Sequence, residues 1–230
     1  MRCLKIAAVA ALTFAAAAVP ALGAVVINAA NTGYSFQIDY AGRVDGTPTP
    51  EVSALGTFTF NSLSTDGKTY NFGYSILNDS TVTSRLSGFG FNTNPNPTGA
   101  AVTGTFTNVE AGNYPGYGTV DICFNSGGNS CAGGGNGGAW QNTSAIGTFS
   151  LTFAEAMASV TFDDFVTRFQ AISGVQAGSS GIGVGSVVSG GGGGGPITAP
   201  EPGTWLMMLV GFGLVGWTAR RRPAPIVQAA

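Results

Sequence analysis

The sequence predicts an all-β fold, a single antiparallel β-sandwich or jelly-roll-like ectodomain over residues 24–172. Three observations predict it. Apolar and polar residues alternate in several short runs, turn-forming residues separate these runs, and no segment before Trp205 repeats its apolar residues with a helical period. About 150 residues are enough to bury one sizeable core, so we expect one domain of about eight strands.

The alternation is typical of strands that have one face in a core. At residues 34–40, aromatic and aliphatic side chains alternate with Ser35, Gln37 and Asp39. Successive side chains of a strand point to opposite faces, so each such run buries one set and exposes the other. The runs expected to form strands are residues 34–40, 58–60, 70–76, 82–86, 89–91, 102–109, 120–124, 149–153 and 160–172.

Residues 1–23 have the organisation of a secretory signal peptide. Arg2 and Lys5 precede an apolar run that Pro20 ends, and Ala21 and Gly23 offer small side chains at the −3 and −1 positions of a cleavage site. The apolar run is too short and too rich in alanine for a good membrane span. We therefore expect export by the Sec translocase and processing by signal peptidase; a buried core helix is the alternative.

The charge of the expected ectodomain argues against a nucleic-acid partner. Residues 24–199 contain four basic and ten acidic residues, which gives a net charge of −6. Four scattered cations cannot neutralise a row of phosphates. Serine, threonine, asparagine and glycine supply most of the polarity, as expected for an extracellular protein that uses neutral hydrogen-bonding groups.

Two cysteines remain after removal of the leader, which contains Cys3. Cys123 and Cys131 flank a glycine-rich loop, and an even pair in an oxidising compartment predicts a disulfide. A metal site is the alternative interpretation. It is disfavoured because the sequence has no histidine and no further cysteine to complete four ligands.

Residues 173–199 are expected to form a flexible linker. They consist mostly of glycine, serine and small aliphatic residues and include six consecutive glycines at 190–195. Such a segment buries too little apolar surface to offset the entropy lost on ordering. The alternative is a poorly patterned final strand around residues 182–188.

The C-terminal segment has the parts of a membrane-directed signal. Residues 200–202 read Pro-Glu-Pro, an extended sequence because each proline fixes its own φ. Residues 204–219 carry no charge and are expected to form one transmembrane helix, and the arginines after them place the C-terminus in the cytoplasm. A short tail, 223–230, follows. The expected signal residues are Pro200, Glu201, Pro202, Trp205, Arg220, Arg221 and Arg222.

The order of these parts resembles the PEP-CTERM sorting signal of Gram-negative bacteria, in its PEPxxWA form. Leu206 stands where that form usually has alanine, and Met207, Met208 and the Gly-Phe-Gly at 211–213 agree with it. The resemblance implies an exosortase partner, transient anchoring in the inner membrane, and then a location at the cell surface or outside the cell. It also implies a structural or adhesive role linked to exopolysaccharide or biofilm.

The ectodomain resembles a subgroup of these proteins called "cistern". The resemblance lies in residues 88–96, 121–124, 131–138 and 162–174. That subgroup implies architecture and no particular chemistry.

We expect no enzymatic activity and no cofactor. The absence of histidine excludes a Ser-His-Asp triad and histidine-bound zinc. A glycosidase needs only two carboxylates, so Asp163, Asp164, Asp121 and Glu155 remain candidates for this alternative. Asp163 and Asp164 are also weak candidates for calcium ligands, although a turn or bulge is the simpler explanation of the pair.

Two further alternatives concern binding and topology. Trp140, Tyr114 and Tyr117 lie in glycine-rich stretches where exposed rings can stack on sugars, so a carbohydrate-binding module is one alternative. Packing into the core is the commoner explanation of such rings. The other is a permanently anchored membrane protein that faces the periplasm, with the same topology and no processing.

Overall fold

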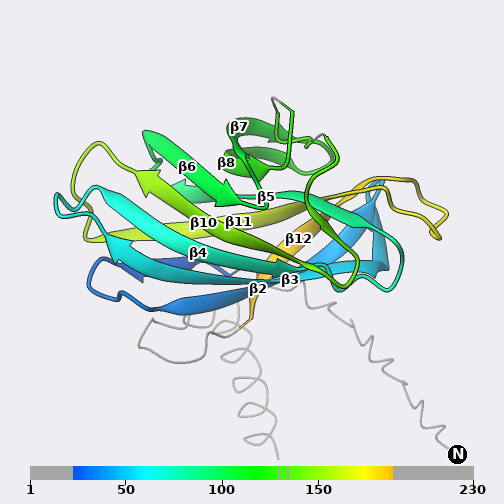
Figure 1. The fold of residues 1–230 in the computed structure, drawn as a ribbon, viewed down its shortest axis with the longest axis horizontal. Helices are drawn as coiled ribbons and strands as arrows, with labels where there is room; N and C mark the ends of the chain where they lie inside the picture. The colour runs from blue at the N-terminus through cyan, green and yellow to red at the C-terminus, as the bar shows by residue number, and fades with distance from the viewer. Residues whose placement is uncertain (1–22, 129, 134, 189–230) are drawn as a thin grey trace, which may run out of the picture.

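The alternating runs become antiparallel strands in the computed structural model, which describes residues 23–128, 130–133 and 135–188 (Figure 1). The expected all-β class is confirmed, and these residues contain no helix. In chain order the strands are β1 (Val25–Asn28), β2 (Ser35–Val44), β3 (Thr47–Leu63), β4 (Thr69–Leu77), β5 (Arg85–Asn94), β6 (Gly99–Gly104), β7 (Asn108–Tyr114), β8 (Gly118–Asn125), β9 (Ala139–Trp140), β10 (Ser144–Thr152), β11 (Ser159–Gln170) and β12 (Gly181–Val188).

One hydrogen-bonded sheet curls into two layers, and every strand pair in it is antiparallel. Its order is β6-β10-β4-β3-β2-β12-β11-β5-β8-β7. The half from β6 to β2 packs over the other half, because Phe72 of β4 lies 5.3 Å from Phe162 of β11, ring centre to ring centre. Tyr74 of β4 likewise lies 5.2 Å from Phe89 of β5. The β2–β12 pair therefore joins the two layers of a sandwich (Figure 1).

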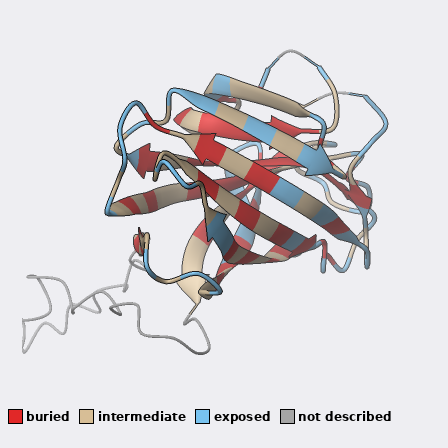
Figure 2. Cartoon of the chain, turned by 60° about the vertical axis from the view of Figure 1, so that its left-hand side comes forward, coloured by how far each residue is buried: buried red, intermediate tan, exposed pale blue. Residues whose placement is uncertain are grey.

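The aromatic side chains of both layers form the core. In β4, for example, Tyr70, Phe72, Tyr74 and Ile76 are buried and the residues between them are not. Figure 2 shows this alternation along the strands. Twelve large side chains are essentially inaccessible to solvent: Tyr40, Tyr70, Tyr114, Phe36, Phe58, Phe60, Phe72, Phe89, Phe91, Phe106, Phe124 and Phe162.

The expected linker is partly wrong, because residues 181–188 form β12. This strand pairs with β11 through Val184↔Val166 and with β2 along its whole length, so it lies inside the sheet. Its glycines suggest disorder by composition, but Gly183 and Gly185 face buried side chains where a Cβ would not fit. The alternative of a final strand is correct. The ectodomain therefore ends later than residue 172 and has more strands than expected, while residues 189–199 lie outside the described residues.

Candidate functional site

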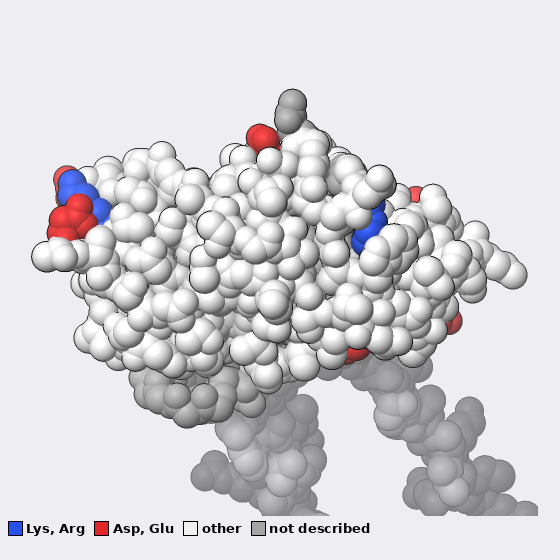
Figure 3. Space-filling view, viewed as in Figure 1, with Lys and Arg blue, Asp and Glu red and all other residues white. Residues whose placement is uncertain are grey.

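The outer face of the layer formed by β3, β4, β10 and β6 is an uncharged polar surface. From Ser53 onward, the solvent-facing positions of these strands contain threonine, serine, asparagine, glycine and a few aliphatic residues. None of them is lysine, arginine, aspartate or glutamate. In Figure 3 the front of the molecule is almost free of charged atoms, and the few visible ones lie toward its ends and rim. This face therefore exerts no strong field on a ligand.

Neighbouring strands pair their hydroxyl groups across this face. Thr103 and Thr148 share a hydrogen bond of 2.8 Å between their Oγ1 atoms, and Thr69 and Thr152 share one of 3.1 Å. Each hydroxyl has one O–H and two lone pairs, so a paired couple still has one O–H and three lone pairs for another partner. The pairs hold the side chains in place while leaving hydrogen-bonding capacity toward solvent.

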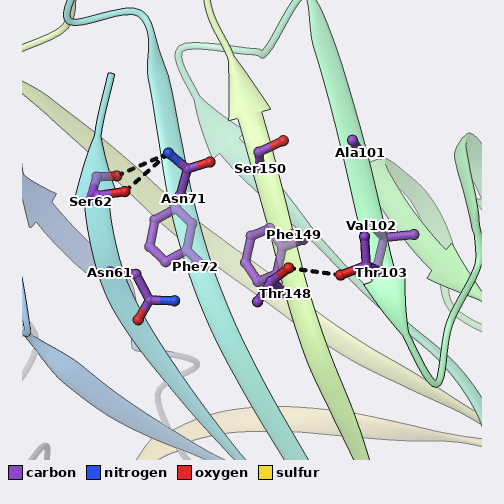
Figure 4. A pocket seen from close by; sticks show the side chains of 10 residues that line it. All are labelled: Asn61, Ser62, Asn71, Phe72, Ala101, Val102, Thr103, Thr148, Phe149 and Ser150. Carbon is purple, nitrogen blue, oxygen red and sulfur yellow. Dashed lines mark hydrogen bonds between the residues drawn. The ribbon is translucent and has the colours of Figure 1, made fainter. Parts of the chain in front are cut away.

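A trough of about 280 Å³ crosses the four strands on this face. It lies beside Gly73, which has no side chain and is paired with both Thr59 of β3 and Thr148 of β10. The backbone over the buried Phe72 and Phe149 forms its floor (Figure 4). Its polar lining consists of Asn61, Ser62, Asn71, Thr103, Thr148 and Ser150.

The side chains that line the trough are all uncharged. None of its lining residues is acidic, basic or a thiol. Asn71 donates from Nδ2 to Ser62 Oγ at 3.2 Å, which fixes the amide at one end of the trough (Figure 4). At the other end the Thr103–Thr148 pair is fixed in the same way. The result is a rigid set of hydroxyl and amide groups over about 14 Å, three times the usual strand spacing of about 4.8 Å.

Sequence reasoning missed the trough because each of its residues has an ordinary pattern. Threonine, serine and asparagine at every second position indicate only a solvated strand face. Phe149 pairs with Val102 on one side and with Phe72 on the other, and this register alone brings the polar neighbours together. The only sequence signal is the absence of charge from residues 52–63, 69–77, 99–104 and 144–152.

Trp140 lies where a ring can meet a ligand, at one end of the sandwich. Its side chain is 49% exposed on the short strand β9. The guanidinium carbon of Arg85 lies 5.9 Å from the ring centre, so one face of the indole contacts a cation. Trp140 does not line the trough, so the two are separate candidate binding positions.

The other two aromatic candidates are not free for stacking. Tyr114 is fully buried in a small second cluster with Val120 and Cys123, as the core-packing explanation predicts. Tyr117 is partly buried and donates a hydrogen bond to Asp164 Oδ1 at 3.4 Å. Burial, together with the charge of Asp164, raises the pKa of Tyr117 to about 12. Tyr114 ends β7 and Tyr117 lies in the short turn between β7 and β8, so both rings pack instead of projecting.

Asp163 and Asp164 occupy a β-bulge, as the simpler explanation of the pair predicts. The register of β11 against β5 shifts between Asp163 and Val166, and Asp164 has a φ of 48°. Burial and then the charges of Asp164 and Asp121 raise the pKa of Asp163. The bulge therefore brings three carboxylates near one another.

These carboxylates accept hydrogen bonds from the protein itself. Asn92 donates from Nδ2 to Asp164 Oδ2 at 2.9 Å, and the Thr93 amide donates to Asp121 Oδ2 at 2.9 Å. In the part of the chain that the structure describes, no three His, Cys, Asp or Glu residues form a group suited to a metal ion. The calcium interpretation gains no support, and Glu155 lies in the exposed turn between β10 and β11.

Two of the four cations of the domain hold the glycine-rich loop between β8 and β9. Arg85 donates to the carbonyl of Gly137 and, at 2.7 Å, to Gln170 Oε1. Arg168 donates to the carbonyl of Ala132 at 3.2 Å. Burial lowers the pKa of both guanidinium groups. These two cations stabilise the loop, and Arg168 also lines, with Arg43, a separate hollow of about 170 Å³.

Cys123 and Cys131 form a disulfide at the base of the same loop. Their Cα atoms are 5.7 Å apart, and both residues are buried in the second cluster. The bond closes a short loop and so lowers the entropy of the unfolded chain. The disulfide expected from the sequence is present in the structure.

We expect Cys131→Ser to lower the free energy of unfolding by about 2–3 kcal/mol, the chain-entropy value for a loop of this length. Guanidinium denaturation of the oxidised full-length chain in a nonionic detergent would measure it. The wild-type chain under reducing conditions is the control and should show a similar loss. Equal stability of oxidised wild type and variant would contradict the prediction.

The described residues thus form an all-β fold with a disulfide and an uncharged outer face. Residues 198–222 match the family model of the PEP-CTERM protein-sorting motif. The chain therefore carries a PEP-CTERM signal, which supports an exosortase partner, export and a membrane-anchored transit step. No curated protein and no solved structure matches the chain.

The signal itself, residues 200–222, and residues 1–22 of the expected leader lie outside the described residues. Within the described ranges no helix is long and apolar enough to cross a membrane. The transmembrane helix at 204–219, the processing by signal peptidase and the "cistern" resemblance remain predictions from the sequence.

Proposed function

We propose that the protein is a structural or adhesive component of the cell surface or extracellular matrix that associates with exopolysaccharide. The observation that carries the proposal is a PEP-CTERM motif on a chain whose folded domain presents an uncharged, hydroxyl-rich face. The motif supports delivery to the surface, and the face supports binding in place of catalysis. Exosortase and the inner membrane act as transient partners during delivery.

The hydrogen-bonding arrangement favours a binding role over the glycosidase alternative. Asp121 and Asp164 each accept hydrogen bonds from neighbouring protein groups, and neither lines the trough. A glycosidase needs a pair of carboxylates on either side of a bound sugar. The trough on the outer face has no carboxylate in its lining.

The carbohydrate-binding alternative has a second possible position, Trp140. Its half-exposed ring favours stacking on a sugar, and Arg85 fixes the ring from one side. A matrix protein can use both Trp140 and the outer face, so retention on polysaccharide is to be measured with each position altered separately.

Sorting is tested by the fate of the C-terminus. With an epitope tag after Ala230, the protein from its native host should lose the tag, because the motif resembles signals that are cleaved before the hydrophobic segment. A host without exosortase should retain tagged, full-length protein in the membrane fraction. Pro200→Ala combined with Pro202→Ala should likewise leave tagged, full-length protein in the membrane fraction of the wild-type host.

Intact-mass measurement of the protein from each strain locates both cleavage sites. A chain that keeps its tag in the wild-type host, in the membrane, would contradict the sorting proposal and favour the permanently anchored alternative. An exosortase-independent cleavage would contradict the proposed partner alone.

A further inference from the structure

We propose that the trough across β3, β4, β10 and β6 is the binding position for an uncharged polysaccharide chain. This inference rests on the proposed function and adds to it the surface and the chemical class of the ligand. The trough is assigned from its charge, its hydrogen-bonding groups and its shape.

The charge of the face selects a neutral partner. A polyanion needs cations near its acidic groups, and the trough lining has none. Arg85 and Arg168, two of the four cations of the domain, are engaged by loop carbonyls away from this face. With its excess of acidic residues, the domain as a whole repels polyanions.

The lining matches the chemistry of a sugar chain. Each sugar hydroxyl both donates and accepts, and so do the threonine, serine and asparagine groups of the trough. Thr148 and Thr103 remain exposed although they pair with each other, so their unused lone pairs and O–H face solvent. Because the pairs already fix these side chains, binding costs little side-chain entropy.

The shape of the trough suits an elongated ligand. Gly73 on β4 has no side chain and Ala101 on β6 has only a methyl group, whereas Asn61 and Thr148 line the trough with longer side chains. A side chain at position 73 would meet the Asn61 amide nitrogen at 3.3 Å, so glycine keeps this space open. A hollow that crosses four strands accommodates a chain, whereas a closed pocket takes a single small molecule.

A second copy of this chain is the competing occupant. Stable contacts between copies bury apolar area at their centre. The only large apolar side chains exposed beyond about a third of their surface are Leu77, Trp140 and Ile146 among the described residues, and none of them lines the trough. The polar lining therefore favours the polysaccharide.

The test removes trough hydroxyls without disturbing the strands. Thr148→Val with Ser150→Val takes two hydroxyls from the trough, and Thr57→Val with Ser75→Val makes the same changes on the same face outside it. Valine favours strands, so both variants should fold. The full-length chains, in a polyoxyethylene detergent, are titrated against insoluble cellulose, cross-linked dextran, agarose and mannan, with alginate gel as the anionic probe.

We expect the wild type to bind at least one neutral polysaccharide, with affinity unchanged between about 0.1 M and about 1 M sodium chloride. The trough variant should bind about tenfold more weakly or worse, since it loses two hydrogen-bonding partners, and the control should bind as the wild type does. Sedimentation should give one monomeric mass for all three.

Each contrary result overturns a different claim. Equal binding by the trough variant overturns the trough assignment, and if Trp140→Ala then abolishes binding, the proposed function stands with Trp140 as its site. Binding confined to alginate and lost in salt overturns the neutral class. If the wild type and the control variant dimerise and the trough variant does not, the face is assigned to a second copy of this chain. No binding by the wild type to any neutral probe or to the host's own matrix overturns the proposed function itself.

Discussion

Phe89→Ala is expected to lower the free energy of unfolding by about 3–5 kcal/mol, a large part of the stability of an ordinary domain. Phe89 is fully buried at the centre of β5. Its ring centre lies 4.9 Å from that of Phe124, 5.2 Å from Tyr74 and 5.6 Å from Phe58. These neighbours come from β8 and from both β3 and β4 of the facing layer, so the truncation opens a cavity between the layers.

Guanidinium denaturation of the full-length chain in a nonionic detergent, followed by far-UV circular dichroism, measures the loss. Ile146→Ala is the matched control, because this large apolar residue is 60% exposed on the outer face. It should change the free energy of unfolding by less than about 1 kcal/mol. Equal losses in the two variants would mean that the layers do not pack through Phe89.

The sandwich could be predicted from the sequence wherever one strand face is buried. Phe36, Ile38 and Tyr40 are all buried, as their alternation with polar residues predicts. The same rule identifies β4, β8 and β10, because each presents aromatic or branched residues at every second position. In β11 the bulge at Asp163 interrupts the alternation. Period-2 patterning therefore gave the fold class without any knowledge of strand order.

Strand β12 was predicted only as the alternative to a linker, because the rule that finds strands depends on large side chains. Its sequence, GIGVGSVV, places glycine at three buried positions, and composition alone suggests a linker. The space that those glycines leave is filled by Tyr40 and Phe165 from neighbouring strands. Only the packing of β2 and β11 shows that the glycines are required.

The candidate site could be predicted still less, for a related physical reason. A trough made of threonine, serine and asparagine exists only when four strands with the right register lie side by side. Trp140 attracts notice in the sequence because a large aromatic residue in a glycine-rich stretch is unusual. The trough residues attract none, although they supply more hydrogen-bonding groups at one place.

The second large effect is expected at Gly185, in the strand that joins the two layers. A Cβ at this position would lie 2.6 Å from the Phe165 Cβ, 2.7 Å from the Ile38 Cγ2 and 2.9 Å from the Tyr40 Cε1. The Phe165 Cβ is attached directly to the backbone of β11 and cannot swing away. Gly185→Val must therefore push β12 out of the sheet or displace β11, at an expected cost of about 3 kcal/mol or more.

Ser186→Val is the control that separates packing from composition. Ser186 is the next residue of the same strand but points outward, with its Oγ donating to the Asp39 carbonyl at 3.5 Å. Valine there should change the free energy of unfolding by less than about 1 kcal/mol, because it favours a strand and meets no core atom. In a flexible linker both valines would be harmless. A large loss of unfolding free energy for Gly185→Val alone, measured by the same denaturation, requires β12 to be a packed strand. If both variants unfold as the wild type does, β12 is not part of the fold.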